Sequence, residues 1–140
     1  KLNATITEAI KKAAAVIAEQ YSPSKIDLDR KGLTAHDATV VAEILKSKTS
    51  VTHVNLYVNT EIGDEGAKAL AEALKVNATV KELVLYNCGI GDDGAAALAE
   101  ALRSNTSLMM LQILGNGIGE RGKQLLRDAV LGREGFKLAL

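Results

Sequence analysis

The sequence has few of the residues that mark secreted, disulfide-bonded or membrane proteins. Its 140 residues contain one cysteine, one proline, three tyrosines, one phenylalanine and no tryptophan. A lone cysteine excludes an internal disulfide, and no apolar run reaches the roughly 18 residues that a membrane span requires. The first residues show no signal-peptide pattern. We therefore expect a cytoplasmic protein that has no membrane partner.

An excess of either charge is also missing. Seventeen basic residues balance seventeen acidic ones, so the formal net charge is zero. The chain therefore has no overall field that would attract nucleic acid or an anionic membrane. Hydrophobic residues make up 47% of the sequence and charged residues 24%, which is typical of one globular domain. We expect a protein partner, and neither nucleic acid nor a small-molecule substrate.

A unit of 28 or 29 residues recurs along the chain. Residues 51–79, 80–107 and 108–135 align with one another, and residues 23–50 fit the same frame, which makes four units. The last two units follow the pattern L-x-x-L-x-L-x-x-N/C-x-L. The residues that carry this pattern in the last two units are Val80, Leu83, Leu85, Cys88 and Ile90, and then Leu108, Leu111, Ile113, Asn116 and Ile118.

Each unit predicts one short strand followed by one helix. Leu83 and Leu85 alternate with other residues, so one face of the strand is apolar. Leu70 and Leu74 are four residues apart, which gives the helix one apolar stripe. Because a single unit cannot bury enough apolar surface alone, neighbouring units must stack. We predict an α/β solenoid, a right-handed horseshoe arc with a parallel concave sheet and helices on the convex side.

The period and the phrase IGDEGAKALAEAL after the strand resemble leucine-rich repeats of the ribonuclease-inhibitor type. That subfamily is shared with innate-immune receptor tails, Ran GTPase-activating proteins and tropomodulins. The resemblance covers roughly residues 23–135. It implies the solenoid fold and a protein-binding function on the concave face, but likeness of fold does not transfer a catalytic role.

The two ends of the chain differ from the repeats. Residues 1–22 begin with a capping box and continue with apolar residues at helical spacing, which predicts an N-terminal capping helix. Residues 136–140 predict a C-terminal edge strand or the start of a fifth repeat, with Phe136 in register with Leu108. An unfinished repeat would fit a fragment of a longer protein.

Three glycines follow the spacing G-x-G-x-x-G of a dinucleotide-binding loop, at Gly89, Gly91 and Gly94. The same spacing recurs one repeat later, whereas a phosphate loop would be unique. Asp92 and Asp93 would also repel phosphate. We therefore interpret the glycines as turns and close-packing positions of the repeat, and we expect no cofactor.

Other candidate chemistry has a structural interpretation. Cys88 occupies the Asn/Cys position of the repeat, so we expect a structural thiol. His36 and His53 lack the spacing of metal ligands. Asn77 and Asn105 fall in glycosylation motifs, but they share one repeat position at a helix C-terminus, where conformation explains asparagine better. We expect no catalytic residues, no metal site and no enzyme activity.

The outward strand positions carry the predicted binding site, because the core does not dictate them. Strands about 4.8 Å apart would put Tyr57 beside Tyr86, and interfaces favour tyrosine anchors. The alternative is that tyrosine and valine simply suit strands. The predicted partner-binding residues are Tyr57, Tyr86, Leu114, Val58, Val84, Met110, His53, Asn55, Glu82 and Gln112, and the charges that could form a rim around them are Lys25, Asp27, Asp29 and Arg30.

The sequence thus predicts a non-catalytic protein-interaction module that binds a partner on its concave sheet. The alternative is a fragment of a larger regulatory, receptor or tropomodulin-like actin-binding protein. Replacing Tyr57 and Tyr86 together by alanine is expected to weaken binding with little change in melting temperature.

Overall fold

A computed structural model describes residues 24–47 and 50–140, and within them it alternates strands with helices. The predicted N-terminal capping helix lies outside the described residues. The elements, in chain order, are β1 (Lys25–Asp27), α2 (Ala35–Ser47), β2 (His53–Asn55), α3 (Gly63–Val76), β3 (Glu82–Val84), α4 (Asp92–Ser104), β4 (Met110–Gln112), α5 (Glu120–Ala129) and β5 (Lys137–Ala139).

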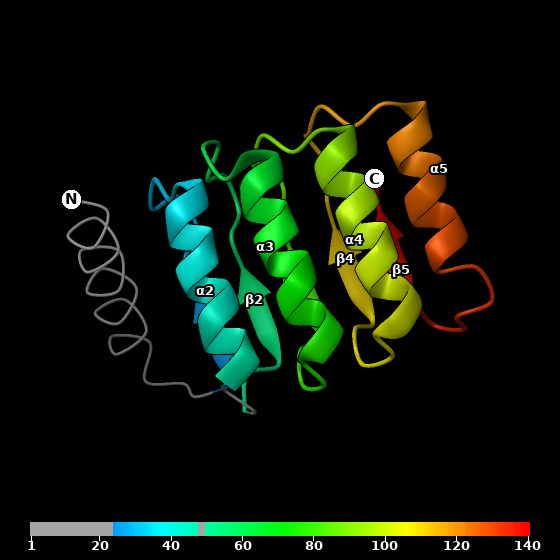
Figure 1. The fold of residues 1–140 in the computed structure, drawn as a ribbon, viewed down its shortest axis with the longest axis horizontal. Helices are drawn as coiled ribbons and strands as arrows, with labels where there is room; N and C mark the ends of the chain where they lie inside the picture. The colour runs from blue at the N-terminus through cyan, green and yellow to red at the C-terminus, as the bar shows by residue number, and fades with distance from the viewer. Residues whose placement is uncertain (1–23, 48–49) are drawn as a thin grey trace.

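The strands form one parallel sheet in the order β1-β2-β3-β4-β5, so each strand lies beside its neighbours in sequence. The helices α2 to α5 form a single layer on one face of this sheet, in the same order (Figure 1). This is the predicted leucine-rich-repeat solenoid. The opposite face of the sheet carries no helix among the described residues. In the described part of the chain, no helix is long and apolar enough to span a membrane.

The register of the first four strands is the predicted one. Lys25, His53, Glu82 and Met110 are successive partners across the sheet. The predicted register of the last strand is wrong by one residue, because Met110 pairs with Lys137, which puts Phe136 level with Met109 rather than Leu108.

The cause of this shift lies in the last helix and the turns after it. Helix α5 has 10 residues, against 13 in α4. Gly132 and Gly135 then turn the chain at φ values of 81° and 82°. The chain therefore returns to the sheet one residue sooner than in the preceding repeat, and Leu138 lies beside Leu111.

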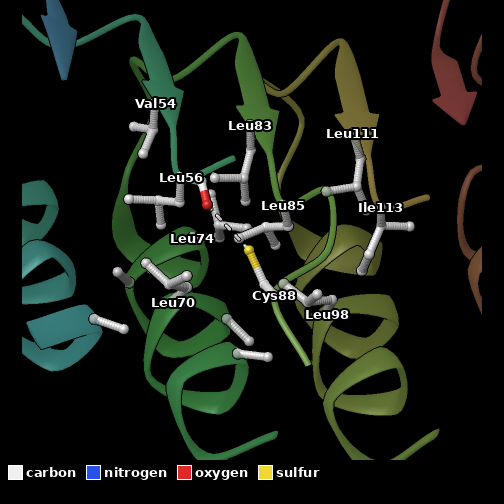
Figure 2. Close-up of a cluster of buried hydrophobic side chains, with 14 of the residues drawn as sticks. Val54, Leu56, Leu70, Leu74, Leu83, Leu85, Cys88, Leu98, Leu111 and Ile113 are labelled. Carbon is white, nitrogen blue, oxygen red and sulfur yellow. Dashed lines mark hydrogen bonds between the residues drawn. The ribbon is translucent and has the colours of Figure 1, made fainter. Parts of the chain in front are cut away.

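The core lies between the sheet and the helices. Figure 2 shows strand residues such as Leu83 and Leu85 pointing toward helix residues such as Leu70, Leu74 and Leu98. All five side chains are 1% exposed or less. The alternation predicted for the strands and the four-residue stripe predicted for the helices are both confirmed, and the other side of each strand is left for side chains that the core does not use.

Buried asparagines join neighbouring repeats by hydrogen bonds. The side-chain oxygen of Asn59 accepts from the backbone N–H groups of Lys31 and Leu33, at 3.1 and 3.0 Å. Its Nδ2 donates to the carbonyl oxygens of Leu28 and Leu56, at 3.0 and 2.9 Å. Four turn groups that face away from water are thereby satisfied by one side chain, which fixes the spacing of consecutive turns.

Candidate functional site

The glycine-rich turn before α4 is occupied by a carboxylate of the preceding repeat. Asp64 Oδ1 accepts hydrogen bonds from the backbone N–H groups of Gly91 and Gly94, at 2.7 and 2.9 Å. Gly89 has a φ of 71°, and a Cβ there would lie 2.5 Å from the carbonyl oxygen of Thr60. A helix N-terminus attracts phosphate through such N–H groups. Here Asp64 already holds them, so the glycine pattern serves the stacking of repeats.

The same arrangement recurs one repeat later. Asp92 Oδ1 accepts from the N–H of Gly119 at 2.7 Å. A Cβ on Gly122 would lie 2.6 Å from Asp92 Oδ1 and 2.7 Å from Cγ2 of Ile118. Asp64 and Asp92 lie in the first turns of α3 and α4, where the helix dipole favours negative charge. In addition, the bonds show that each aspartate acts on the helix of the next repeat, which the sequence pattern did not reveal.

Cys88 is a buried structural residue. Its Sγ donates to the carbonyl oxygen of Leu56 at 3.1 Å, and its own N–H donates to Oδ1 of Asn116 at 2.8 Å. Burial raises the pKa of the thiol from 9.0 to about 11. The thiolate, which is the nucleophilic form, is therefore disfavoured, in line with the predicted structural role.

Asn77 and Asn105 are buried at the ends of α3 and α4. Asn77 Nδ2 donates to the carbonyl oxygen of Leu45 at 2.8 Å, and Asn105 Nδ2 donates to that of Leu74 at 2.7 Å. The two side chains are thus engaged in the interior, and their residues are only 7% and 4% exposed. A glycan on either Nδ2 would break these bonds, which supports the conformational interpretation.

The two histidines lie in different layers of the fold. His36 lies on α2, in the helical layer, and His53 lies on β2 in the sheet. Nδ1 of His53 is 2.7 Å from Oγ1 of Thr52, and its Nε2 is 3.3 Å from Oε2 of Glu82. Among the described residues, no group of three or more histidine, cysteine, aspartate or glutamate side chains is arranged to hold a metal ion.

All ten residues predicted to bind a partner are accessible to solvent. Leu114 is 38% exposed, and the other nine are half-buried. A shallow hollow lies over β1 to β3, on the face without helices, and it includes His53, Asn55, Glu82 and Val84 in its lining. Neither tyrosine lines this hollow. The predicted set is therefore spread over a hollow and over the turns that follow the strands.

Tyr57 and Tyr86 lie side by side just beyond the ends of β2 and β3. Their ring centroids are 4.8 Å apart and their planes differ by 10°, so the rings are stacked. The guanidinium of Arg30 lies 5.0 Å from the centroid of Tyr57. A Cβ on Gly115 would lie 3.3 Å from the Tyr86 ring. The two rings thus form a stack between Arg30 and the backbone of Gly115, and the predicted adjacency of the tyrosines is confirmed.

The turns that hold this stack share one unusual backbone conformation. Arg30, Val58, Asn87 and Gly115 have φ values of 51°, 55°, 50° and 72°. Glycine and asparagine suit this left-handed region, but a β-branched residue such as Val58 does not. The sequence predicted Val58 only as a partner-binding residue, because apolar patterning says nothing about φ.

Two features of this face were missed by sequence reasoning. Arg30 was placed in a charged rim, but its side chain lies over Tyr57. Lys137 continues the column of Met110, and only the shortened α5 connection brings it there. The position of Arg30 could have been anticipated from an arginine close to a column of tyrosines. The position of Lys137 had no signal in the repeat pattern.

Comparisons with known proteins agree with this geometry. A family model described as "Leucine Rich repeat" matches residues 47–71 and 76–99. A solved structure titled "Leiomodin-1 Actin-Binding Site 2 (ABS2)" superposes with a TM-score of 0.74 over 94% of this chain and 76% of that chain, at 21% identity. At that identity the likeness shows the fold alone. No protein of curated function matches the sequence. Together the two matches support a leucine-rich-repeat family.

Proposed function

We propose that this protein is a non-catalytic recognition module that binds a partner protein on the helix-free face of its sheet. The observation that carries the proposal is the stacked pair of Tyr57 and Tyr86, ordered at 4.8 Å on a surface that the core does not require. Tyrosine anchors in a preformed geometry lose little conformational entropy on binding. The leucine-rich-repeat solenoid, shared with a structure named as an actin-binding site, supports a protein as the partner.

A second candidate is an actin-binding or regulatory module that belongs to a longer protein. The match to the leiomodin-1 structure covers 94% of this chain, which favours actin as the first partner to test. The ribonuclease-inhibitor-type subfamily and the cytoplasmic location also stay proposals, based on the repeat phrase and on the single cysteine.

The test compares binding of actin, and of proteins captured from a cell extract, by the wild type and by Val84→Arg. Val84 is half-buried on β3 and points away from the core, so arginine there adds bulk and charge to the binding face. Thr39→Arg, on the exposed side of α2, is the matched control. We expect Val84→Arg to lower binding at least tenfold and Thr39→Arg to leave it unchanged. Equal binding by all three proteins would refute the proposed face.

A further inference from the structure

The helix-free face of the sheet divides into two halves that differ in how their side chains are paired. On the β1–β2 side, Nδ2 of Asn55 donates to Oδ1 of Asp27 at 3.0 Å. Nε2 of His53 lies 3.3 Å from Oε2 of Glu82. The Asn55–Asp27 hydrogen bond satisfies both of its groups, and the His53–Glu82 contact is an ion pair when the histidine is protonated, so a partner that used these groups would have to break existing contacts.

Of the remaining charged groups on that side, Arg30 and Asp29 are engaged as well. Arg30 lies over the ring of Tyr57, with its Nη1 4.0 Å from Oδ2 of Asp29. Lys25 is exposed at the start of β1. The β1–β2 half is therefore a charged surface whose groups are mostly paired internally.

Apart from Glu82 at the start of β3, the β3–β4 half has the opposite character. It presents three apolar side chains and two carboxamides, and we call this set the amide–apolar patch: Val84, Asn87, Met110, Gln112 and Leu114. Within the described part of the chain, the side chains of Asn87 and Gln112 make no hydrogen bond. No member of the patch carries a charge. Its two amides are the side-chain groups that can exchange solvent for a hydrogen bond to a partner.

The patch is continuous across two strands. Val84 is the register partner of Gln112, and parallel strands lie about 4.8 Å apart. The N–H of Asn87 donates to the carbonyl oxygen of Leu114 at 3.0 Å, so the turns after the strands are also adjacent. The Tyr57–Tyr86 stack borders the patch on one side, where Glu82 is also the register partner of Met110. Lys137 lies beside Met110 on the other side.

We propose that the amide–apolar patch binds an extended, uncharged and largely apolar peptide segment of the partner protein. The inference rests on the proposed function and specifies where on the face the partner lies. A carboxamide offers both a donor and an acceptor, which matches the N–H and C=O of an unpaired peptide backbone. A helical segment satisfies its backbone groups internally, so it would leave Asn87 and Gln112 without partners.

The competing site is the hollow over β1 to β3, which shares Val84 with the patch and has Lys25, Asp27 and Glu82 in its lining. That hollow would favour a basic side chain. Binding there would cost the Asn55–Asp27 and His53–Glu82 contacts, whereas binding at the amide–apolar patch breaks no side-chain hydrogen bond of Asn87 or Gln112 within the described residues. The balance of contacts broken and formed therefore favours the patch.

The experiment selects binders from a phage-displayed library of random peptides about twelve residues long, against the folded wild-type protein. Synthetic copies of the selected peptides are then titrated by fluorescence anisotropy. We expect apolar sequences with few charges. Gln112→Leu, which keeps the size but removes the amide, should weaken them about tenfold. Lys25→Leu, on the charged half, and Thr39→Leu, on the helical layer, should stay within about twofold.

The outcomes separate this inference from the proposed function. Basic peptides that gain affinity for Lys25→Leu, because a repelling positive charge is removed, and that ignore Gln112→Leu would place binding in the hollow, which overturns the patch but keeps the recognition face. Selected peptides that become helical when bound, as seen by circular dichroism, would also overturn it. A library without binders, or with binders insensitive to both Lys25→Leu and Gln112→Leu, would count against the face itself.

Discussion

Replacing Asp64 by alanine should destabilise the protein by removing the bond between two repeats. Its Oδ1 accepts from the N–H groups of Gly91 and Gly94, at 2.7 and 2.9 Å, at the start of α4. Removing a capping side chain costs about 0.5–2 kcal/mol. Hydrogen bonds to a charged group are worth about 1.5–3 kcal/mol each, but water replaces part of each bond because Asp64 is only half-buried. We expect a loss of about 2 kcal/mol.

The assay is urea unfolding followed by circular dichroism, with thermal melting as a second measurement. For a chain of this size, 1 kcal/mol corresponds to about 3–5 °C in melting temperature, so Asp64→Ala should lower it by roughly 6–10 °C. Asp64→Asn keeps a neutral acceptor oxygen and should lose about half as much.

Asp93→Ala is the matched control. Asp93 is an exposed acid in the first turn of the same helix, so it shares the favourable field of the helix N-terminus. Its removal should cost about 0.3–1 kcal/mol. If Asp64→Ala and Asp93→Ala destabilise equally, the two hydrogen bonds contribute nothing beyond that field, and Asp64 does not hold the two repeats together.

Three further predictions concern the turns, the thiol and the rings. Val58→Asn should raise the free energy of unfolding by about 1 kcal/mol, because asparagine tolerates the φ of 55° that strains valine. The thiol of Cys88 has a pKa raised to about 11 in the folded state. The buried, protonated thiol should stabilise the fold fully below about pH 9. This stabilisation should be lost as the pH rises toward 11, which lowers the free energy of unfolding by about 2–3 kcal/mol. Replacing Tyr57 and Tyr86 together by alanine should cost about 2 kcal/mol.

The turn and thiol predictions each have their own control. A stability of Val58→Asn below that of the wild type would show that packing, rather than backbone strain, decides this position. For the thiol, the wild type is compared with Cys88→Ala across the pH range, because the difference cancels lysine and tyrosine titration. A difference that stays constant from pH 8 to pH 11 would contradict the raised pKa.

The sequence predicted the features of the fold that depend on the repeat period. The repeat length placed Val54, Leu83 and Leu111 in adjacent inward positions, and the same register put Tyr57 beside Tyr86. These results follow because a two-residue alternation and a nearly constant repeat length leave few other ways to bury the leucines.

The sequence did not predict contacts that depend on rotamers or on a change of repeat length. The reach of Asp64 into the next repeat and of Arg30 over Tyr57 depends on side-chain torsions. The register of β5 depends on where α5 ends, which a pattern built from three longer repeats could not show. The division of the face into a paired half and an unpaired half likewise follows from individual contacts such as that of Asn55 with Asp27.

The tyrosine stack contributes contacts to the fold as well as forming part of the proposed binding face, and this changes how that face must be tested. The sequence alone predicts a nearly unchanged melting temperature for the double alanine variant, but rings stacked at 4.8 Å, with Arg30 over one of them, contribute to the fold. Lost binding in that variant would therefore not separate a missing anchor from a disturbed turn. Replacing Tyr57 and Tyr86 by phenylalanine keeps both rings and removes only the hydroxyl groups. If the tyrosines anchor a partner through those hydroxyls, the phenylalanine variant should bind more weakly while its melting temperature stays within about 2 °C of the wild type.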